Sequence, residues 1–254
     1  VRSRRQRQMC IRDRSTWPTF ATALIRHPDG VRVGIAVDYL LLDGFSVQLL
    51  LTELAACYLD PETSLPELDV SFRDYVLAAG TSPADREASV SYWTDRLESL
   101  PQAPHLPVAV DPAQIDTPVF QRRAGRLEAE QWTQVKQWCR QAGVTPSSVL
   151  LACYSHVLSA FSARPELTLN LTLFDRSRVH PHIDRVLGDF TSLTLLEHRP
   201  TAEESLADAA QRLQRQLASD LDHRGVSALW VQRELARRTC LLYTSPSPRD
   251  ATLS

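Results

Sequence analysis

Two carboxylates at positions 38 and 43 are the first residues of this sequence whose types and spacing could do chemistry. Asp38 ends an apolar stretch, and Asp43 comes directly before Gly44 and a run with helical spacing. Backbone N–H groups at a helix N-terminus favour a negative side chain, so Asp43 is expected to be a cap or a salt-bridge anchor. A carboxylate ending a buried strand is costly unless paired, so Asp38 is either a structural partner or an active-site acid.

Polar side chains on two later segments form a second set of candidates. Residues 167–174 alternate strictly and place Asn170 and Thr172 on the face opposite the leucines. Near the start of the next apolar segment, Asp189 and Thr191 share a face. Amide and hydroxyl groups can orient an acid or stabilise developing charge, which makes Asn170 and Thr191 candidate catalytic residues. Plain structural hydrogen bonding is the alternative.

Two aspartates lie near the end of a long amphipathic segment, residues 201–223. Asp220 and Asp222 flank its apolar stripe. The helix dipole disfavours negative charge at this end and favours the protonated form, which suits proton donation. We expect Asp222 to be the acid, and the alternative is that both aspartates are solvated surface charges. No metal is expected, because the histidines and cysteines lack ligand spacing and no further carboxylate completes a cage around Asp38 and Asp43.

The candidate residues must be positioned by helices and strands, and the sequence shows patterns of both kinds along the chain. Residues 31–37 alternate like a half-buried strand, and the turn chemistry at 28–30 predicts a hairpin with Leu24 and Ile25. Ser46 is expected to cap the helix that follows. The other expected strands are 120–127, 167–174 and 190–197, and the expected helices are 46–59, 70–79, 85–100, 128–142, 145–163 and 201–223. This mixture predicts an α/β or α+β fold with two lobes.

A proline-rich stretch suggests where the lobes divide. Residues 101–118 contain five prolines and no period, so they are expected to be an extended connector. Residues 15–100 then form the C-terminal part of an N-lobe, and residues 119–239 form the N-terminal part of a C-lobe.

The two ends have an unusual relationship at the level of DNA. Residues 240–245 and 9–13 can be encoded by opposite strands of one short element, which resembles a transposon end used in preparing sequencing libraries. We interpret residues 1–14 and 240–254 as adapter-derived and non-native. A basic nucleic-acid-binding tail is the alternative.

The remaining composition excludes several classes of function. The ends hold seven of the 28 basic and two of the 30 acidic side chains, so the interior keeps 21 basic and 28 acidic ones. This acidic balance argues against nucleic-acid binding. Cys57, Cys139 and Cys153 suit free thiols in a reducing cytosol. No apolar run reaches the roughly 18 residues of a membrane span, so we expect a soluble, cytoplasmic protein without a membrane partner.

Residues 38–46 resemble the signature of heterocyclization domains, which belong to the condensation-domain superfamily of nonribosomal peptide synthetases. In that alignment Asp38 and Tyr39 take the places of two histidines found in ordinary condensation domains, while Asp43 and Gly44 are retained. The general base of a condensation domain is therefore absent.

Further segments resemble motifs of the same family in the same order. Asp175 and Asp184 stand where the family pattern has asparagines, and both add negative charge near the tunnel that the resemblance implies. The matching segments are residues 72–75, 92–93, 100–107, 169–176, 180–181 and 188–196, so the resemblance covers nearly all of residues 17–239.

The resemblance implies a two-lobed chloramphenicol-acetyltransferase-like fold, incomplete at both ends, with a tunnel between the lobes. It implies an enzyme that joins an acyl group to carrier-bound Cys, Ser or Thr and cyclodehydrates the product to a thiazoline or oxazoline. No cofactor binds directly, because the substrates arrive on the phosphopantetheine of carrier proteins. The implied partners are upstream and downstream peptidyl carrier domains and an adjacent adenylation domain. The expected catalytic residues are Thr191, Asp222 and Asn170, and the expected structural or tunnel residues are Asp38, Asp43, Gly44, Thr172 and Asp189.

Two other functions fit parts of the sequence. A non-catalytic condensation-like module that only docks carrier proteins would also tolerate Tyr39 in place of a histidine. An ordinary amide-forming condensation domain is disfavoured by the missing histidine pair. Because both lobes are expected to be incomplete, we predict that residues 15–239 made alone are insoluble or inactive.

Overall fold

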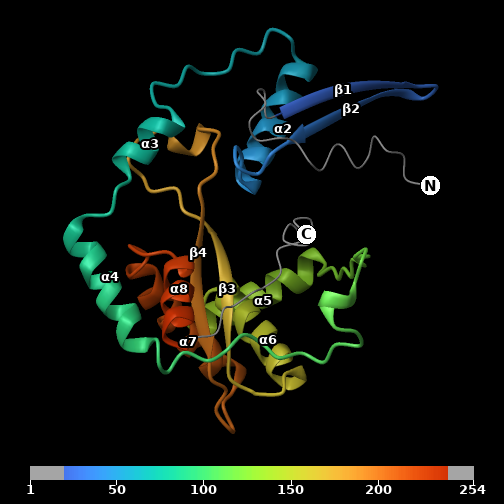
Figure 1. The fold of residues 1–254 in the computed structure, drawn as a ribbon. Coiled ribbons are helices and arrows are strands. Elements are labelled where there is room, and N and C mark those ends of the chain that lie inside the picture. Colours follow the sequence, from blue (N-terminus) through green and yellow to red (C-terminus); the bar gives the residue numbers. More distant parts are fainter. Residues whose placement is uncertain (1–19, 240–254) are drawn as a thin grey trace. The chain divides into compact units, whose positions relative to one another are not determined.

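The computed structural model describes residues 20–239 as a mixture of helices and strands (Figure 1). The adapter-derived segments expected at 1–14 and 240–254 lie outside these residues. The elements are β1 (Phe20–His27), β2 (Gly30–Val37), α2 (Gly44–Leu59), α3 (Phe72–Ala78), α4 (Pro83–Arg96), η1 (Pro112–Gln114), α5 (Ala129–Gln141), α6 (Pro146–Phe161), β3 (Leu167–Phe174), η2 (Ile183–Arg185), β4 (Thr191–His198), α7 (Leu206–Asp222) and α8 (Ala228–Thr239).

The chain forms two compact units. It passes from one unit to the other after residue 80, and again within strands β3 and β4. Among the described residues, unit 1 comprises 20–80 and 172–192, and unit 2 comprises 81–171 and 193–239. The first boundary between the units, after residue 80, precedes the proline-rich stretch at 101–118, where the sequence suggested that the lobes divide. Helix α4 belongs to unit 2 because its Trp93 and the C-cap residue Leu97 are buried there.

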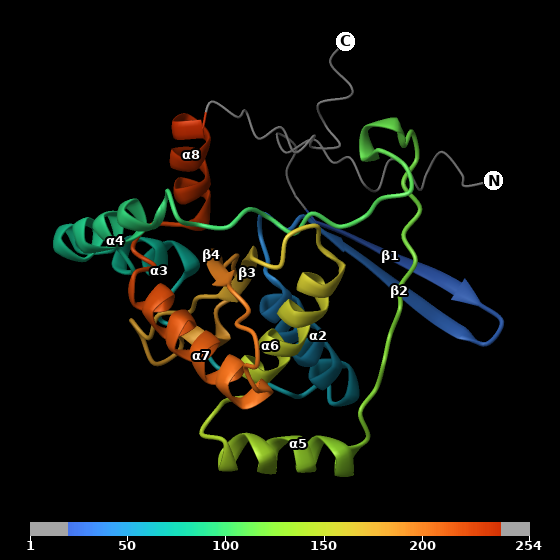
Figure 2. The ribbon, with the colours of Figure 1, turned by 90° about the horizontal axis from the view of Figure 1, so that it is seen from below.

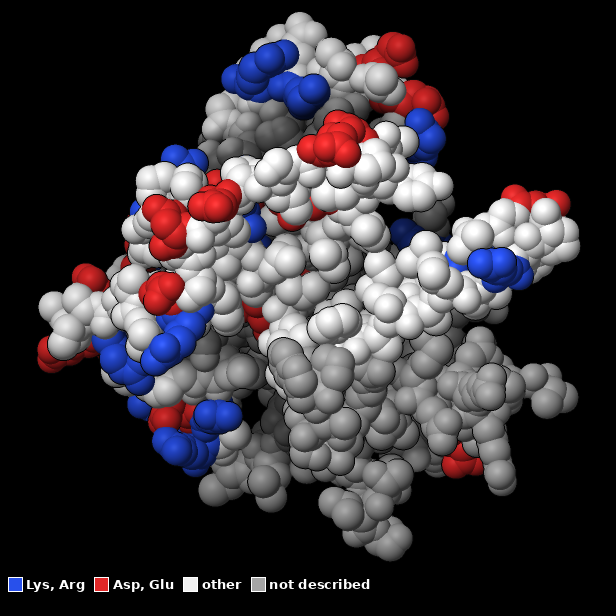
Figure 3. Space-filling view, turned by 90° about the horizontal axis from the view of Figure 1, so that it is seen from above, with Lys and Arg blue, Asp and Glu red and all other residues white. Residues whose placement is uncertain are grey.

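Unit 1 contains the expected hairpin. Strands β1 and β2 pair antiparallel from Phe20 opposite Val37 to His27 opposite Gly30, and Gly30 has a φ of +145°, which favours glycine. The hairpin exposes several apolar side chains, and Figure 3 shows its surface as mostly uncharged atoms. The exposed apolar residues of the hairpin are Phe20, Leu24, Ile25, Val31 and Val33.

Helix α2 begins at Gly44, two residues before Ser46. Asp43 is the N-cap, since its side chain accepts a hydrogen bond from the N–H of Ser46, so the expected Ser46 cap is wrong. Ser46 is instead fully buried, inside the first turn. Helix α3 begins at a capping box formed by Ser71 and Asp74.

An aromatic cluster forms the core of unit 1. The ring of Phe190 makes edge-on contacts with Phe72 and Tyr75, with centroids 5.0 and 4.7 Å apart. Ile183 and Val186 are buried beside them. Residues from α3 and from the segment before β4 therefore share one core.

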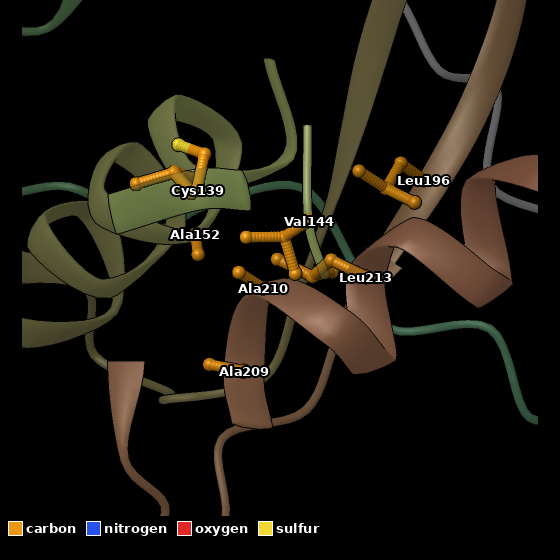
Figure 4. Close-up of a cluster of buried hydrophobic side chains, with 8 residues drawn as sticks. Cys139, Val144, Ala152, Leu196, Ala209, Ala210 and Leu213 are labelled. Carbon is orange, nitrogen blue, oxygen red and sulfur yellow. The ribbon is translucent and has the colours of Figure 1, made fainter. Parts of the chain in front are cut away.

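Unit 2 has two apolar clusters, and the first includes residues of the amphipathic helix α7. Helices α6 and α7 pack against each other, and Figure 2 shows them with α5 beneath. In the first cluster Leu213 and Ala210 of α7 meet Leu196 of β4, as Figure 4 shows. The second cluster joins α4, β4 and α8 and consists of Trp93, Leu97, Leu195, Val226, Ala228 and Val231.

The expected strand at 120–127 is wrong, because residues 119–128 contain neither strand nor helix. Val119 and Phe120 are 85% and 91% exposed, so their apolar side chains have no described surface to pack on. The strand at 167–174 is confirmed, with Leu167 and Leu169 buried and Asn170 exposed.

No single helix among residues 20–239 is long and apolar enough to cross a membrane. Helices α5 and α6 would pass such a test only together, and the chain bends by 98° between them.

Candidate functional site

Asp43 is buried with both carboxylate oxygens engaged. Its Oδ1 accepts a hydrogen bond from the N–H of Ser46 at 2.7 Å, and its Oδ2 accepts one from the N–H of Phe190 at 3.3 Å. The N–H of Asp43 donates to the carbonyl oxygen of Gly188 at 3.0 Å. The expectation that Asp43 caps a helix is therefore confirmed. Its contacts join the start of α2 to the segment before β4, both within unit 1.

Arg176 completes this junction. Its Nη2 lies 2.8 Å from Oγ of Ser46 and 3.5 Å from Oδ1 of Asp43, and its Nη1 donates to the carbonyl oxygens of Ile183 and Val186. The guanidinium lies 3.8 Å from the centroid of the Phe190 ring. Burial lowers the pKa of Arg176, and the Asp43 carboxylate opposes that effect. We call Asp43, Ser46, Arg176 and Gly188 the brace of unit 1.

The position of residue 188 in the brace requires a glycine, because no side chain fits there. A Cβ at this position would lie 2.2 Å from Cδ2 of Phe72. The N–H of Gly188 donates to Oγ of Ser46 at 3.1 Å, and its carbonyl oxygen accepts from the same hydroxyl at 2.8 Å. At Gly44, the first residue of α2, an added Cβ would lie 3.4 Å from Cζ of Phe174, which is van der Waals distance.

Asp38 lies apart from the brace and lines a cavity of about 220 Å³. Its Oδ1 accepts a hydrogen bond from the N–H of Leu40 at 3.0 Å. The side chain of Tyr39, in the place of the second histidine, is 79% exposed. Apart from Asp38 the lining carries no charge and consists of Ile35, Val37, Tyr39, Leu42, Val47, Leu50 and Leu51.

Thr191 and Thr172 are exposed residues of unit 1. Asp189 lies two residues before the start of β4, and its Oδ1 accepts a hydrogen bond from the N–H of Thr191 at 3.1 Å. This contact fixes the backbone at Thr191 while leaving its side chain in solvent.

Asn170 and the two candidate aspartates belong to unit 2. Asn170 is exposed, and its Oδ1 accepts a hydrogen bond from Nε2 of Gln232 at 3.0 Å. Asp222, the last residue of α7, is exposed, whereas Asp220 is completely buried. The structure thus places Thr191 in one unit and Asn170 and Asp222 in the other.

Asp220 receives three hydrogen bonds on one oxygen. Its Oδ1 lies 2.9 Å from Oη of Tyr92, 2.5 Å from Nη1 of Arg96 and 3.0 Å from Nε2 of Gln216. Burial raises the pKa of Asp220 above its usual range, against the lowering effect of these donors. Burial and the Asp220 carboxylate raise the pKa of Tyr92 to about 12, so its hydroxyl stays protonated. No pattern in the sequence pointed to Arg96, which lies 124 residues from Asp220.

Asp69, His180 and His182 form a further cluster of unit 1. Oδ1 of Asp69 lies 2.8 Å from Nδ1 of His182 and 3.5 Å from Nε2 of His180. Nδ1 of His180 accepts a hydrogen bond from the N–H of His182, which places the proton of a neutral His180 ring on Nε2. Because that proton is directed at the carboxylate, the arrangement favours hydrogen bonding over metal ligation.

The sequence matches known proteins over most of its length. The family model described as "Condensation domain" matches residues 3–241. Pyochelin synthetase PchE of Pseudomonas aeruginosa is 38% identical over 221 residues, which are 86% of this chain and 15% of that protein. Phenyloxazoline synthase MbtB of Mycobacterium tuberculosis is 33% identical over 223 residues, or 86% of this chain and 16% of that one. The chain thus spans only about one sixth of these relatives.

A solved structure has the same fold. The cyclization-docking bidomain of the EpoB nonribosomal peptide synthetase from Sorangium cellulosum matches with a TM-score of 0.83 and 35% identity. The match covers 95% of this chain and 51% of the bidomain chain. The expected condensation-type fold is therefore confirmed.

Proposed function

Because the chain belongs to the condensation-domain family of nonribosomal peptide synthetases, we propose that it is part of a heterocyclization domain. Such a domain joins a carrier-bound acyl group to the amine of carrier-bound Cys, Ser or Thr. It then closes the side chain onto the new amide and releases water, leaving a thiazoline or oxazoline. The partners are peptidyl carrier domains that present substrates on phosphopantetheine, and an adenylation domain of the same cytoplasmic synthetase.

The observation that carries this proposal is which residues occupy the motif at 38–44 and what they contact. Asp43 is engaged in the brace, and Asp38 and Tyr39 stand where ordinary condensation domains have histidines. Neither position offers an imidazole as general base. Relatives whose names specify a phenyloxazoline synthase and a cyclization domain support the same assignment.

Ring closure needs a proton donor, and Asp222 is the proposed donor. Attack of the side-chain thiol or hydroxyl on the amide carbonyl gives a carbon that bears a hydroxyl group. That hydroxyl leaves as water only after it gains a proton. The Asp222 side chain is exposed at the end of α7 and is accessible to a substrate, whereas the Asp220 side chain is completely buried and paired with Arg96.

Thr191 and Asn170 remain proposed contributors. An exposed hydroxyl in unit 1 and an exposed amide in unit 2 can each bind a polar group of the substrate. Asp38, Thr172 and Asp189 are proposed to shape the substrate path rather than to transfer protons.

The test uses the complete synthetase with loaded carrier domains and follows its products by mass spectrometry. A heterocyclization domain yields a product that weighs one water less than the linear amide. Accumulation of the linear amide alone would show an ordinary condensation domain. Binding of carrier domains without either product would show a docking module.

A further inference from the structure

The cavity of about 220 Å³ beside Asp38 is formed by two elements of unit 1 that follow each other in the chain. Ile35 and Val37 are two residues apart on β2 and therefore share one face of the strand. Val47, Leu50 and Leu51 follow one another at helical spacing and share one face of α2. These two apolar faces and the loop between them line the cavity.

The cavity opens to the surface, where a substrate can reach it. Two residues of its lining are exposed, Tyr39 by 79% and Leu51 by 50%, whereas its other lining residues are half-buried. Tyr39 and Leu51 therefore mark its mouth. An acyl group presented at the surface of unit 1 can enter there.

The volume of the cavity suits one apolar side chain. An engineered cavity of roughly 150 Å³ lined by Leu, Ile and Phe takes up benzene. The cavity of about 220 Å³ therefore has room for a branched aliphatic side chain or a single aromatic ring. Filling it removes apolar surface of both the ligand and the protein from water, which favours binding.

The carboxylate of Asp38 decides what else the ligand must carry. It is the one charged group in the lining of this cavity. Its Oδ1 accepts a hydrogen bond from the N–H of Leu40, and its Oδ2 has no partner among the described residues. A carboxylate repels a phosphate and attracts a cation, so the cavity disfavours the phosphate of a phosphopantetheine arm. It favours an ammonium group attached close to an apolar side chain, as in an aminoacyl group whose amine is free.

We propose that this cavity selects the donor acyl group. It binds the apolar side chain of an aminoacyl group, and Asp38 pairs with the free ammonium group. The inference rests on the proposed heterocyclization function and names the class of upstream substrate that the domain joins to carrier-bound Cys, Ser or Thr. Valyl, leucyl and phenylalanyl groups have both features, whereas an acyl group without an amine has only the apolar one.

The first experiment tests the apolar part of the site in the complete synthetase, with the upstream carrier domain loaded with a valyl or a glycyl group. Leu51→Trp narrows the mouth and should lower the rate of amide formation from valyl, relative to glycyl, by roughly 10-fold. Leu54→Trp is the matched control, because Leu54 lies three residues later on α2, is 46% exposed and does not line the cavity. Single-turnover rates followed by mass spectrometry give both ratios.

The second experiment tests the charge. It compares valyl with N-acetylvalyl, which keeps the side chain and lacks the ammonium group. Asp38→Asn should lower the preference for valyl over N-acetylvalyl by roughly 10-fold, because the ammonium group loses a charged acceptor. Asp29→Asn removes the same charge from the exposed turn of the hairpin and should leave the preference unchanged.

The unaltered synthetase should prefer valyl over both glycyl and N-acetylvalyl. The absence of that preference would overturn the inference, and so would a Leu51→Trp or Asp38→Asn variant that slows every donor equally. Failure of the proposed function gives a different result. In that case the unaltered synthetase forms the linear amide without a ring, while its donor preferences can still be measured. A synthetase that forms no amide at all would overturn both.

Discussion

Nη2 of Arg176 lies 3.5 Å from Oδ1 of Asp43, although 133 positions separate the two residues in the chain. Both side chains are buried in unit 1. Arg176→Met should destabilise the domain by roughly 3 to 5 kcal/mol, because Asp43 would keep a buried charge without its counter-ion. Denaturant unfolding of the complete domain measures this loss. Arg178→Met removes an exposed guanidinium two residues away and should change stability by less than about 0.5 kcal/mol. Equal losses in the two variants would contradict the brace.

Gly188→Ala should also destabilise unit 1, by roughly 1 to 3 kcal/mol, since the added Cβ would overlap the ring of Phe72. Gly80→Ala is the control, because a Cβ there meets nothing within 4 Å. Combining Gly188→Ala with Phe72→Leu should recover part of the loss. A double variant that loses the sum of both single effects would show that the overlap is not the cause.

His198 should make unit 2 sensitive to acid. It is completely buried, and neither ring nitrogen has a hydrogen-bond partner among the described residues. Burial, with Arg212 and His156 nearby, lowers its pKa to about 4. The unfolded chain, with an ordinary histidine pKa of about 6.5, binds the proton first, so stability falls as pH drops from about 6.5 to 4.

His198→Leu tests this titration. The variant should match or exceed the original stability at pH 7 and lose less of it toward pH 4. Thermal unfolding across this pH range gives both slopes. The exposed His105, replaced by Gln, is the control and should leave the slope unchanged. Parallel slopes for His198→Leu and the original protein would rule out His198 as the source.

Asp220→Asn and Asp222→Asn distinguish the two aspartates at the end of α7. Asp222→Asn should slow ring formation by roughly 100-fold or more while amide formation continues, because it removes the proposed general acid. If Asp220 is the acid, the larger effect falls on Asp220→Asn instead. Quantifying linear and cyclised products in the same reaction decides between them.

Thr191→Val should slow ring formation if the exposed hydroxyl binds the reacting group. Thr191→Ser retains the hydroxyl and should restore most of the rate. Single-turnover measurements separate this step from amide formation. Equal rates in Val and Ser variants would assign Thr191 a structural role only.

Local patterns in the sequence predicted the elements well. The alternation at 31–37 and the turn at Gly30 predicted the hairpin. The alternation at 167–174 predicted β3. The apolar residues at 120–127 suggested a strand, but no described strand pairs with them, because the pattern contains no information about pairing partners.

The buried aspartate could have been identified from helix geometry. Asp220 is seven residues after Leu213, nearly two full helical turns, so it shares the buried face. Asp222 is nine residues after Leu213, or two and a half turns, and faces the opposite side. The partners Arg96 and Tyr92 were beyond prediction, since they come from a helix distant in sequence and depend on tertiary packing.

The contacts of the brace can form only late in the synthesis of the domain. Asp43 and Ser46 leave the ribosome long before Arg176, Gly188 and Phe190, which supply their partners. Joining segments so far apart carries a loop-closure entropy that local helices avoid, and it slows folding. The brace therefore cannot form, and the Asp43 carboxylate stays in water, until the chain has been translated as far as β4.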